Sequence, residues 1–258
     1  MIRAQDIASA DLDIRKFVIR VAAEVGDVLG ERLAGLYLHG SLATGSFLRH
    51  ESDIDVMILV DGPLSAATRN ALEQTLRELN RSRPSKGELE ISVIQARHAK
   101  NYEHPLPVEL QLNSKHSAVP AQLMDVKQRA VRLTGDEPAY AIGAIPWYAF
   151  MSAVLADFED KASRIDSHPV QTLLSACRTL HDASAPSIRI LSKLEAAQWA
   201  LEIVPQEFKP IIRDAIAAYR ENASRALDRK TVEQFREYVR EQSHTAFEKV
   251  RDTGEDDE

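Results

Sequence analysis

Two acidic residues stand one position apart inside an apolar run. Asp53 and Asp55 belong to the stretch SDIDVMILV, residues 52–60. Residues two apart on a β-strand point to the same face, and carboxylates on one face repel each other unless a cation lies between them. Such oxygen ligands suit Mg²⁺. The alternative is an edge strand with two solvated aspartates, but the apolar residues after Asp55 favour a buried central strand with a metal site.

A Gly-Ser pair comes shortly before these aspartates. Gly40 and Ser41 follow the short apolar segment LYLH. Glycine lets a ligand approach the backbone closely, and free N–H groups together with a serine hydroxyl can hold phosphate oxygens. Taken alone, such a pair is a common turn. In combination with the carboxylates of the next strand, it predicts a phosphate site that faces a metal site.

A third acidic residue lies on the polar side of another apolar segment. In ELEISVI, residues 88–94, apolar residues alternate with Glu90 and Ser92, which places Glu90 on the polar face of a strand. If this strand neighbours residues 52–60, three carboxylates converge. Such a set can hold metal ions while one member accepts a proton from an attacking hydroxyl. A solvent-facing glutamate on an amphipathic strand is the alternative.

Two basic residues in the C-terminal half are candidates for binding phosphate. Ser192 and Glu195 have the spacing of a capping box, so a helix is expected to begin at Ser192. Lys193 then lies in the first turn, where a cation opposes the helix dipole and a bound anion would reverse the effect. Arg178 interrupts an otherwise apolar helix. The alternatives are an exposed lysine and a salt-bridged or snorkelling arginine.

The spacing of apolar residues predicts the elements that must position these groups. In the first half we expect a helix over 11–29, strands over 36–40, 52–60 and 88–94, and a helix over 65–80. Glycines and prolines interrupt the chain after about residue 135. Beyond them we expect helices over 147–165, 170–183, 192–204, 210–227 and 232–251.

This order of elements predicts an α+β fold in two domains. Residues 1–140 form a small mixed sheet with flanking helices, and residues 141–252 form an all-α helical bundle. Residues 253–258 form an acidic tail that we expect to be disordered, because it is dominated by negative charge.

Composition limits the classes of function. The chain has 44% hydrophobic and 28% charged residues, as soluble globular proteins do, and no apolar run of membrane-spanning length. The sole cysteine, Cys177, excludes an internal disulfide and is expected in the core. The N-terminus lacks a signal-peptide pattern, so we expect a cytoplasmic protein. The net charge is −7, of which the last seven residues contribute −5. The rest of the chain is nearly neutral, which argues against nucleic-acid binding. We expect a monomer without membrane partners.

The N-terminal motif resembles that of the nucleotidyltransferase superfamily. The pattern H-G-S-x₁₁-D-x-D, followed by an acidic residue on a later strand, matches residues 39–55 and Glu90. Members transfer a nucleoside monophosphate from a nucleoside triphosphate to a hydroxyl group, using two divalent ions. The resemblance assigns Asp53 and Asp55 as catalytic metal ligands, Glu90 as the third carboxylate, and Gly40, Ser41 and Ser52 as nucleotide contacts.

The C-terminal half resembles the helical domain of aminoglycoside adenylyltransferases of the streptomycin/spectinomycin type. The matching residues are a C-R-x-L helix, residues 177–180, and S-K-x-E-A-A-x-W-A, residues 192–200. In that family the arginine and the lysine bind the ATP phosphates, which implies these roles for Arg178 and Lys193. The resemblance implies transfer of AMP from ATP, with Mg²⁺, to an antibiotic hydroxyl, with Glu90 as general base. Glu109 and Asp157 are candidates for holding the cationic acceptor.

The chain also departs from the family pattern. The loop between Arg178 and Lys193 is longer than the family's, and the segment before Arg178 lacks the tryptophan of the streptomycin-binding enzymes. Spectinomycin is therefore favoured over streptomycin. Two other interpretations stay open at this point: a nucleotidyltransferase that modifies a protein or an RNA, as toxin–antitoxin members do, and a non-catalytic relative that binds a nucleotide or ligand.

Overall fold

The mixed sheet lies in the first half of the chain. In the computed structural model, which describes residues 5–161, 168–184, 189–221 and 227–253, the chain divides into two compact units at Ile145–Pro146. This division lies close to the boundary expected after residue 140. The acidic tail beyond residue 253 lies outside the described residues. Thr253, expected in that tail, is the last residue of the final helix.

The N-terminal unit contains a five-stranded sheet with the order β4-β3-β2-β1-β5. Its strands are β1 Leu33–His39, β2 Ile54–Val60, β3 Leu89–Gln95, β4 Leu110–Leu112 and β5 Val131–Gly135. β2 is parallel to β3, and the other pairs are antiparallel. The expectation that the strand after Asp53 is a central one is therefore confirmed, because β2 has a partner on each side. Since β2 begins at Ile54, Asp53 stands at its entry.

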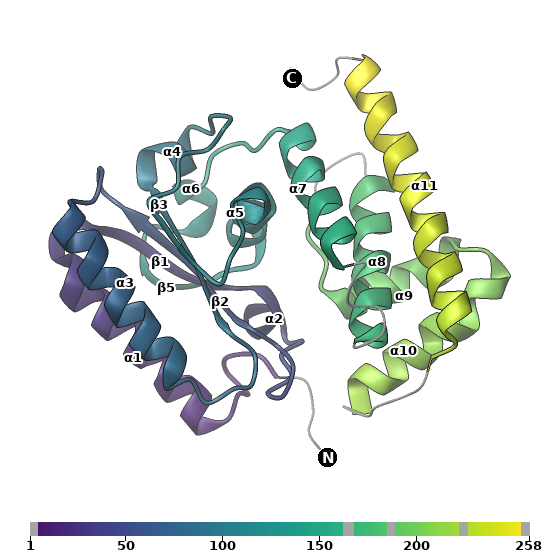
Figure 1. Ribbon diagram of the computed structural model, residues 1–258, viewed down its shortest axis with the longest axis horizontal. Helices are drawn as coiled ribbons and strands as arrows, with labels where there is room; N and C mark the ends of the chain where they lie inside the picture. Colours follow the sequence, from purple (N-terminus) through teal and green to yellow (C-terminus); the bar gives the residue numbers. More distant parts are fainter. Residues whose placement is uncertain (1–4, 162–167, 185–188, 222–226, 254–258) are drawn as a thin grey trace. The chain divides into compact units, whose positions relative to one another are not determined.

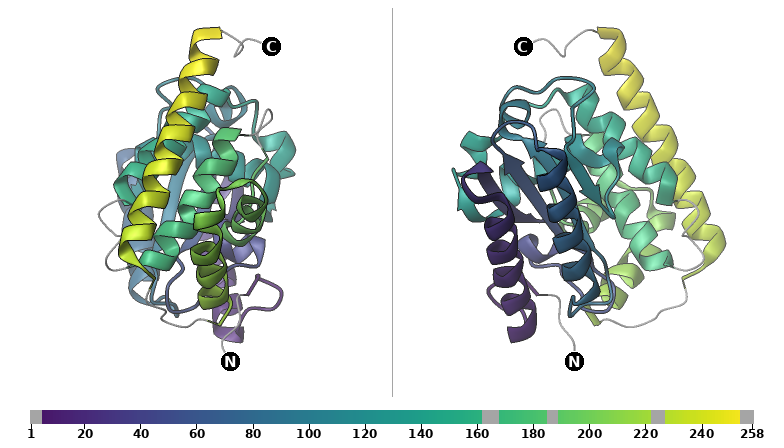
Figure 2. Two further views of the ribbon diagram at one scale, coloured as in Figure 1. Left: turned by 90° about the vertical axis from the view of Figure 1, so that its right-hand side faces the viewer. Right: turned by 60° about the vertical axis from the view of Figure 1, so that its left-hand side comes forward.

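Helices cover both faces of this sheet. α1 Leu12–Leu29 and α3 Ala66–Arg81 run side by side on one face, and α5 Val119–Arg129 lies on the other (Figures 1 and 2). Apart from Gln95 at the end of β3, the face toward α1 and α3 is largely apolar because most inward strand positions are aliphatic. These positions include Leu36, Leu38, Val56, Ile58, Ile91 and Val93. The opposite face carries His39, Asp55, Glu90 and Ser92.

Several short elements were not expected from the pattern of apolar residues. They are η1 Gly30–Arg32, α2 Gly40–Thr44, α4 Ala96–Lys100, β4, η2 His116–Ala118, α5, β5 and α6 Pro138–Ala141. β4 has three residues and β5 is partly exposed, so neither shows a clear alternation of buried positions. α5 has a proline in its first turn, where the missing N–H costs nothing. Of the elements that were not predicted, α5 matters most, because it carries a residue of the site described below.

The C-terminal unit is entirely helical within the described ranges. Its helices are α7 Trp147–Asp160, α8 Pro169–Ser184, α9 Lys193–Ile203, η4 Gln206–Phe208, α10 Lys209–Glu221 and α11 Arg229–Thr253. The α8 helix contacts α7, α9, α10 and α11, which explains why most of its residues are buried. Cys177 is one of them, as expected, and burial raises the pKa of its thiol. The parts of the expected helices that cover residues 162–165 and 222–226 lie outside the described residues.

No helix in the described part of the chain is long and apolar enough to cross a membrane.

The capping box expected at Ser192 is present, since its hydroxyl accepts the N–H of Glu195 while the Glu195 carboxylate accepts the N–H of Ser192. The helix that begins there therefore places Lys193 at its first position.

Candidate active site

Side chains from three neighbouring strands form one row across the polar face of the sheet. His39 of β1 is paired with Asp55 of β2, and Asp55 is paired with Glu90 of β3. Directly paired residues project from the same face, with Cβ atoms about 5 Å apart. The carboxylates were expected to converge only if their two strands are neighbours. The pairing of β2 with β3 confirms that they are. The row places a possible proton acceptor, Glu90, beside a possible metal ligand, Asp55.

The backbone at the entry to β3 holds Asp53 in position. The Oδ1 atom of Asp53 accepts the N–H of Glu88 at 2.7 Å. The chain can come this close because residue 87 is glycine: a Cβ there would lie 2.1 Å from the carbonyl oxygen of Ser52. The Ser52 hydroxyl accepts the N–H of Leu48 at 2.9 Å and so closes the turn that precedes Asp53. Hydrogen bonds to the backbone therefore fix both Asp53 and Ser52. A nucleotide contact by Ser52 stays a prediction.

Gly40 packs directly against Asp55. Its φ angle is +67°, and a Cβ at this position would lie 2.1 Å from the Oδ2 atom of Asp55. Its N–H donates to the Oδ2 atom of Asp125 at 2.8 Å. The expectation of free N–H groups at the Gly-Ser turn is therefore wrong for Gly40, whose N–H already has a carboxylate partner. Ser41 follows as the second residue of α2, and its contact with phosphate stays a prediction.

Two residues next to this turn, His39 and Asp125, were not predicted from the sequence as part of the site. The Nδ1 atom of His39 lies 3.2 Å from the Oδ2 atom of Asp125, and the His39 side chain is buried. Burial opposes a charge on His39, but the hydrogen bond with Asp125 and the charges of Asp55 and Asp125 outweigh it and raise the pKa of the imidazole above 6.5. The position of His39 directly before Gly40 was the one available signal.

The carboxylates form an open row rather than a closed metal cage. Among the residues that the structure describes, no group of three His, Cys, Asp or Glu side chains is arranged to hold a metal ion by itself. Mg²⁺ usually takes one or two protein carboxylates and completes its shell with water and phosphate oxygens. The donor set fits that requirement, because Asp53 and Asp55 carry hard carboxylate oxygens two residues apart, with Glu90 beside Asp55.

Asp157, Arg178 and Lys193, which the sequence suggested separately, lie near one another in the helical unit. Asp157 forms an ion pair with Lys161, the residue that directly follows α7. Its Oδ2 atom is 3.9 Å from Nη2 of Arg178 on α8. Lys193 donates to the Oε1 atom of Gln171 at 2.7 Å. Burial tends to raise the pKa of Asp157, but the charges of Lys161, Arg178 and Lys193 outweigh it and lower the pKa. Asp157 therefore contacts Lys161 and Arg178, and the charge of Lys193 acts on it as well.

The structure does not bring Glu109 to the carboxylate row. Its Oε2 atom accepts from Arg69 at 2.9 Å and from the N–H of Leu64 at 3.2 Å, and its other oxygen accepts from the Gln95 amide. Gln95 ends β3, whereas Glu90 is near its start, a separation of roughly 16 Å along a strand. These contacts indicate a structural ion pair at the far end of the sheet.

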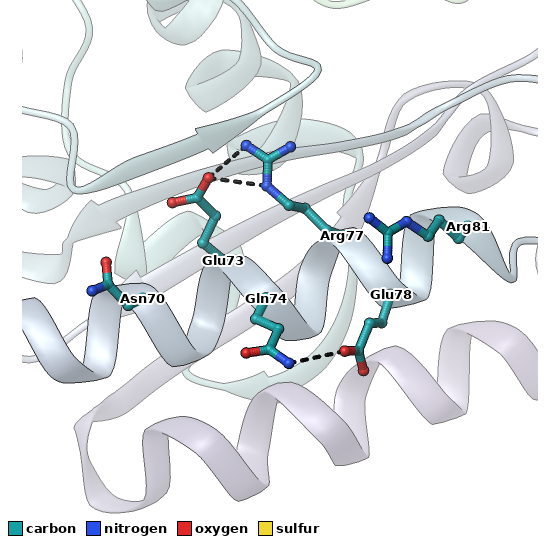
Figure 3. A pocket seen from close by; sticks show the side chains of 6 residues that line it. All are labelled: Asn70, Glu73, Gln74, Arg77, Glu78 and Arg81. Atoms are coloured by element: carbon teal, nitrogen blue, oxygen red, sulfur yellow. Dashed lines mark hydrogen bonds and ion pairs between the residues drawn. The ribbon is translucent and has the colours of Figure 1, made fainter.

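A shallow hollow elsewhere on the N-terminal unit contains none of the candidate residues. It lies along α3 and is lined by Asn70, Glu73, Gln74, Arg77, Glu78 and Arg81 (Figure 3). Figure 3 shows that its side chains pair along the helix, Arg77 with Glu73 and Gln74 with Glu78. Because the spacing is one helical turn, these pairs are the usual pattern of a solvated helix face.

Comparison with known families matches both halves of the chain. A nucleotidyltransferase domain model matches residues 20–132, and a model described as "Aminoglycoside adenylyltransferase, C-terminal domain" matches residues 141–242. The two occur in the order expected from the motifs. The chain belongs to the aminoglycoside adenylyltransferase family. This membership places the carboxylate row in a nucleotidyltransferase domain and Arg178 and Lys193 in the domain particular to the family.

Relatives and a solved structure agree with this membership. A spectinomycin 9-adenylyltransferase of Staphylococcus aureus is 23% identical over 214 residues, covering 76% of this chain and 81% of the relative. An aminoglycoside (3'') (9) adenylyltransferase of Klebsiella pneumoniae is 25% identical over 252 residues, covering 86% and 95%. The crystal structure of the spectinomycin adenyltransferase AAD(9) from Enterococcus faecialis, with ATP and spectinomycin, superposes with a TM-score of 0.70 at 18% identity, covering 89% of this chain and 99% of that one. It confirms the fold.

Proposed function

We propose that this family member transfers AMP from ATP to a hydroxyl group of an aminoglycoside or aminocyclitol antibiotic, and that this modification confers resistance. Spectinomycin is the favoured acceptor over streptomycin, because spectinomycin enzymes are among the relatives and the segment before Arg178 lacks a tryptophan. The observation that carries the proposal is the pairing of Asp55 with Glu90 on adjacent parallel strands. It sets a possible general base directly beside a possible metal ligand.

The carboxylates have different roles in the proposal. Asp53 and Asp55 would hold two Mg²⁺ ions together with Glu90, and the ions would supply charge neutralisation for the triphosphate. Asp53 presents its carboxylate from a fixed position because the N–H of Glu88 holds one of its oxygens. The Asp55 carboxylate packs against the backbone of Gly40, which has no side chain to displace it. Both acids therefore keep their orientation before the nucleotide binds.

Glu90 acts as the general base on the acceptor. Its carboxylate takes the proton of the acceptor hydroxyl, whose oxygen then forms a bond to the α-phosphorus of ATP. The bond between that phosphorus and the bridging oxygen breaks, and pyrophosphate leaves with the electron pair. Because phosphoryl transfer is accelerated mainly by positioning and by electrostatic stabilisation, the fixed register of Asp55 and Glu90 is the main contribution of the sheet.

The cations of the helical unit bind phosphate oxygens of the nucleotide. Asp157 forms an ion pair with Lys161 and lies 3.9 Å from Arg178, and the charge of Lys193 also lowers its pKa. The positive charges of Arg178 and Lys193 favour an anion such as a triphosphate. Asp157 therefore serves in this proposal to hold the cations, in place of the acceptor contact expected from the sequence.

The remaining partners follow from the substrates. ATP and a cationic small molecule are the binding partners, and we expect neither nucleic acid nor a membrane to bind. We further propose that the protein acts in the cytoplasm as a monomer. A cytoplasmic site agrees with a need for ATP and with a single cysteine that is buried and unpaired.

Mass spectrometry after incubation of the protein with ATP, Mg²⁺ and an antibiotic tests the proposal directly. We expect spectinomycin to gain one AMP group with release of pyrophosphate, and streptomycin to remain unmodified. A catalytically impaired variant, Glu90→Gln, is the matched control for chemical adenylylation. Transfer of labelled AMP to proteins or RNA of a lysate, without any modified antibiotic, would instead support the macromolecular alternative. No transfer to any acceptor would contradict the proposal.

A further inference from the structure

We infer that Asp125 is a positioning residue of the nucleotide site, which holds the Gly40 turn in the conformation that binds the triphosphate. The inference rests on the proposed function and adds a residue of α5 to it. Asp125 lies far along the chain from the Gly-Ser pair and belongs to none of the motifs that indicate nucleotidyl transfer.

One oxygen of Asp125 contacts two groups on either side of the strand-to-helix junction. Its Oδ2 atom accepts the N–H of Gly40 at 2.8 Å and lies 3.2 Å from Nδ1 of His39. His39 is the last residue of β1, and Gly40 is the first residue of α2. The carboxylate therefore joins the end of the strand to the start of the turn.

Packing against the sheet fixes the position of Asp125. Leu123 and Val126, its neighbours on α5, are fully buried. One turn before Asp125, the side chain of Gln122 accepts from the hydroxyl of Ser92 on β3 at 2.8 Å and donates to Ser114 at 2.9 Å. α5 is thus attached to β3 through Gln122 and to β1 through Asp125. The strands that carry Glu90 and His39 are held by the same helix.

Gly40 needs such a restraint because it is a glycine. Glycine is required at this position by the φ angle of +67° and by the close approach of Asp55. The same residue type populates both positive and negative φ readily, so nothing intrinsic to Gly40 keeps the turn in one conformation. A charge-assisted hydrogen bond from its N–H to a carboxylate removes that freedom.

Binding of ATP with Mg²⁺, measured by titration calorimetry without acceptor, tests the inference on full-length variants. We expect Asp125→Ala to weaken ATP binding about tenfold or more, the effect of losing a hydrogen bond to a charged group. Asp125→Asn keeps an oxygen that can accept the Gly40 N–H, so we expect a loss of about threefold. KM for the acceptor is expected to stay unchanged in both variants, which a general loss of structure would not produce.

Thermal unfolding and a matched control complete the experiment. Asp27→Ala removes an exposed carboxylate from α1, which covers the opposite face of the sheet, and should change neither ATP affinity nor turnover. If Asp125→Ala does not fold, Asp125→Asn and Asp125→Glu, which moves the carboxylate by one methylene, must still weaken ATP binding. Unchanged ATP affinity in a folded Asp125 variant would overturn the inference. Absence of ATP binding by the unmodified protein would overturn the proposed function, and this inference with it.

Discussion

The carboxylate of Asp55 occupies the space in which a side chain at residue 40 would begin. A Cβ on Gly40 would lie 2.1 Å from the Oδ2 atom of Asp55, and the glycine has a φ angle of +67°. Contacts shorter than van der Waals distance cannot be accommodated without movement of one partner. The Gly-Ser turn and the aspartate strand, separated by more than ten residues in the chain, are therefore fitted to each other.

Gly40→Ala should reduce turnover at least about a hundredfold, because the methyl group displaces Asp55 and because an alanine at positive φ costs about 1–2 kcal/mol. Steady-state kinetics and thermal unfolding would measure both effects. Gly26→Ala is the matched control, since a Cβ there meets nothing within 4 Å and Gly26 lies inside α1. Full activity of the Gly40 variant would show that Asp55 needs no support from this turn.

Glu90→Gln should lower kcat by about 10²–10⁴-fold, the usual contribution of a general base, while ATP still binds. The amide keeps the shape of the side chain but cannot accept the proton of the acceptor hydroxyl. Glu73→Gln on the exposed face of α3 is the control for loss of one negative charge (Figure 3). Near-normal turnover in the Glu90 variant would remove Glu90 as the base.

Asp55→Ala should abolish the part of ATP affinity that depends on Mg²⁺. The reason is that a carboxylate holding Mg²⁺ binds the nucleotide through the shared metal. Titration with ATP, in the presence of Mg²⁺ and again with a chelator, would measure ATP affinity under both conditions. The two affinities should differ greatly for the unmodified protein and should be equal for the variant. Asp61→Ala, an exposed aspartate after β2, should behave as the unmodified protein. Equal Mg²⁺ dependence in the two variants would refute the assignment of Asp55.

Glu109→Gln should destabilise the protein without affecting the acceptor. Glu109 is buried and accepts from Arg69, Gln95 and the N–H of Leu64. Loss of its charge should lower the free energy of unfolding by about 1–2 kcal/mol, as measured by urea denaturation. KM for the antibiotic should not change. A raised KM with unchanged stability would restore the role in acceptor binding that the sequence suggested.

Asp157→Asn should lower stability at neutral pH but not in acid. The pKa of Asp157 is lowered from 3.8 in the folded protein, since Lys161 and Arg178 outweigh the effect of burial. A carboxyl whose pKa is lower in the folded than in the unfolded protein stabilises the fold at pH values above its unfolded pKa. This stabilisation is lost as the pH falls through the pKa of the folded protein. Because the carboxylate is 38% exposed, we expect a difference of only about 0.5–1 kcal/mol. Urea denaturation from neutral pH to about pH 3 would follow it. A pH-independent difference would contradict the prediction.

The groups that could be found from the sequence are those whose pattern is local. Asp53 and Asp55 are two residues apart in an apolar run. Ser192 is the N-cap of α9 and forms a capping box with Glu195, three residues later. In each case the periodicity of a strand or helix is sufficient to place the side chains together. Glu109 shows the opposite situation. It is an acidic residue in a chain that is expected to bind a cation, yet its partners, Arg69 and Gln95, are distant in sequence and satisfy its charge.

The sequence by itself determined the fold class, the family resemblance and the individual candidate carboxylates, because all three depend on residue types at short, regular spacings. Only the tertiary structure decided which groups complete the site. Asp125 meets Gly40 and His39 across more than eighty residues of chain, and Asp157 meets Arg178 rather than an acceptor. No periodicity encodes such contacts, because they arise when packing of α5 against the sheet, and of α7 against α8, brings distant residues together.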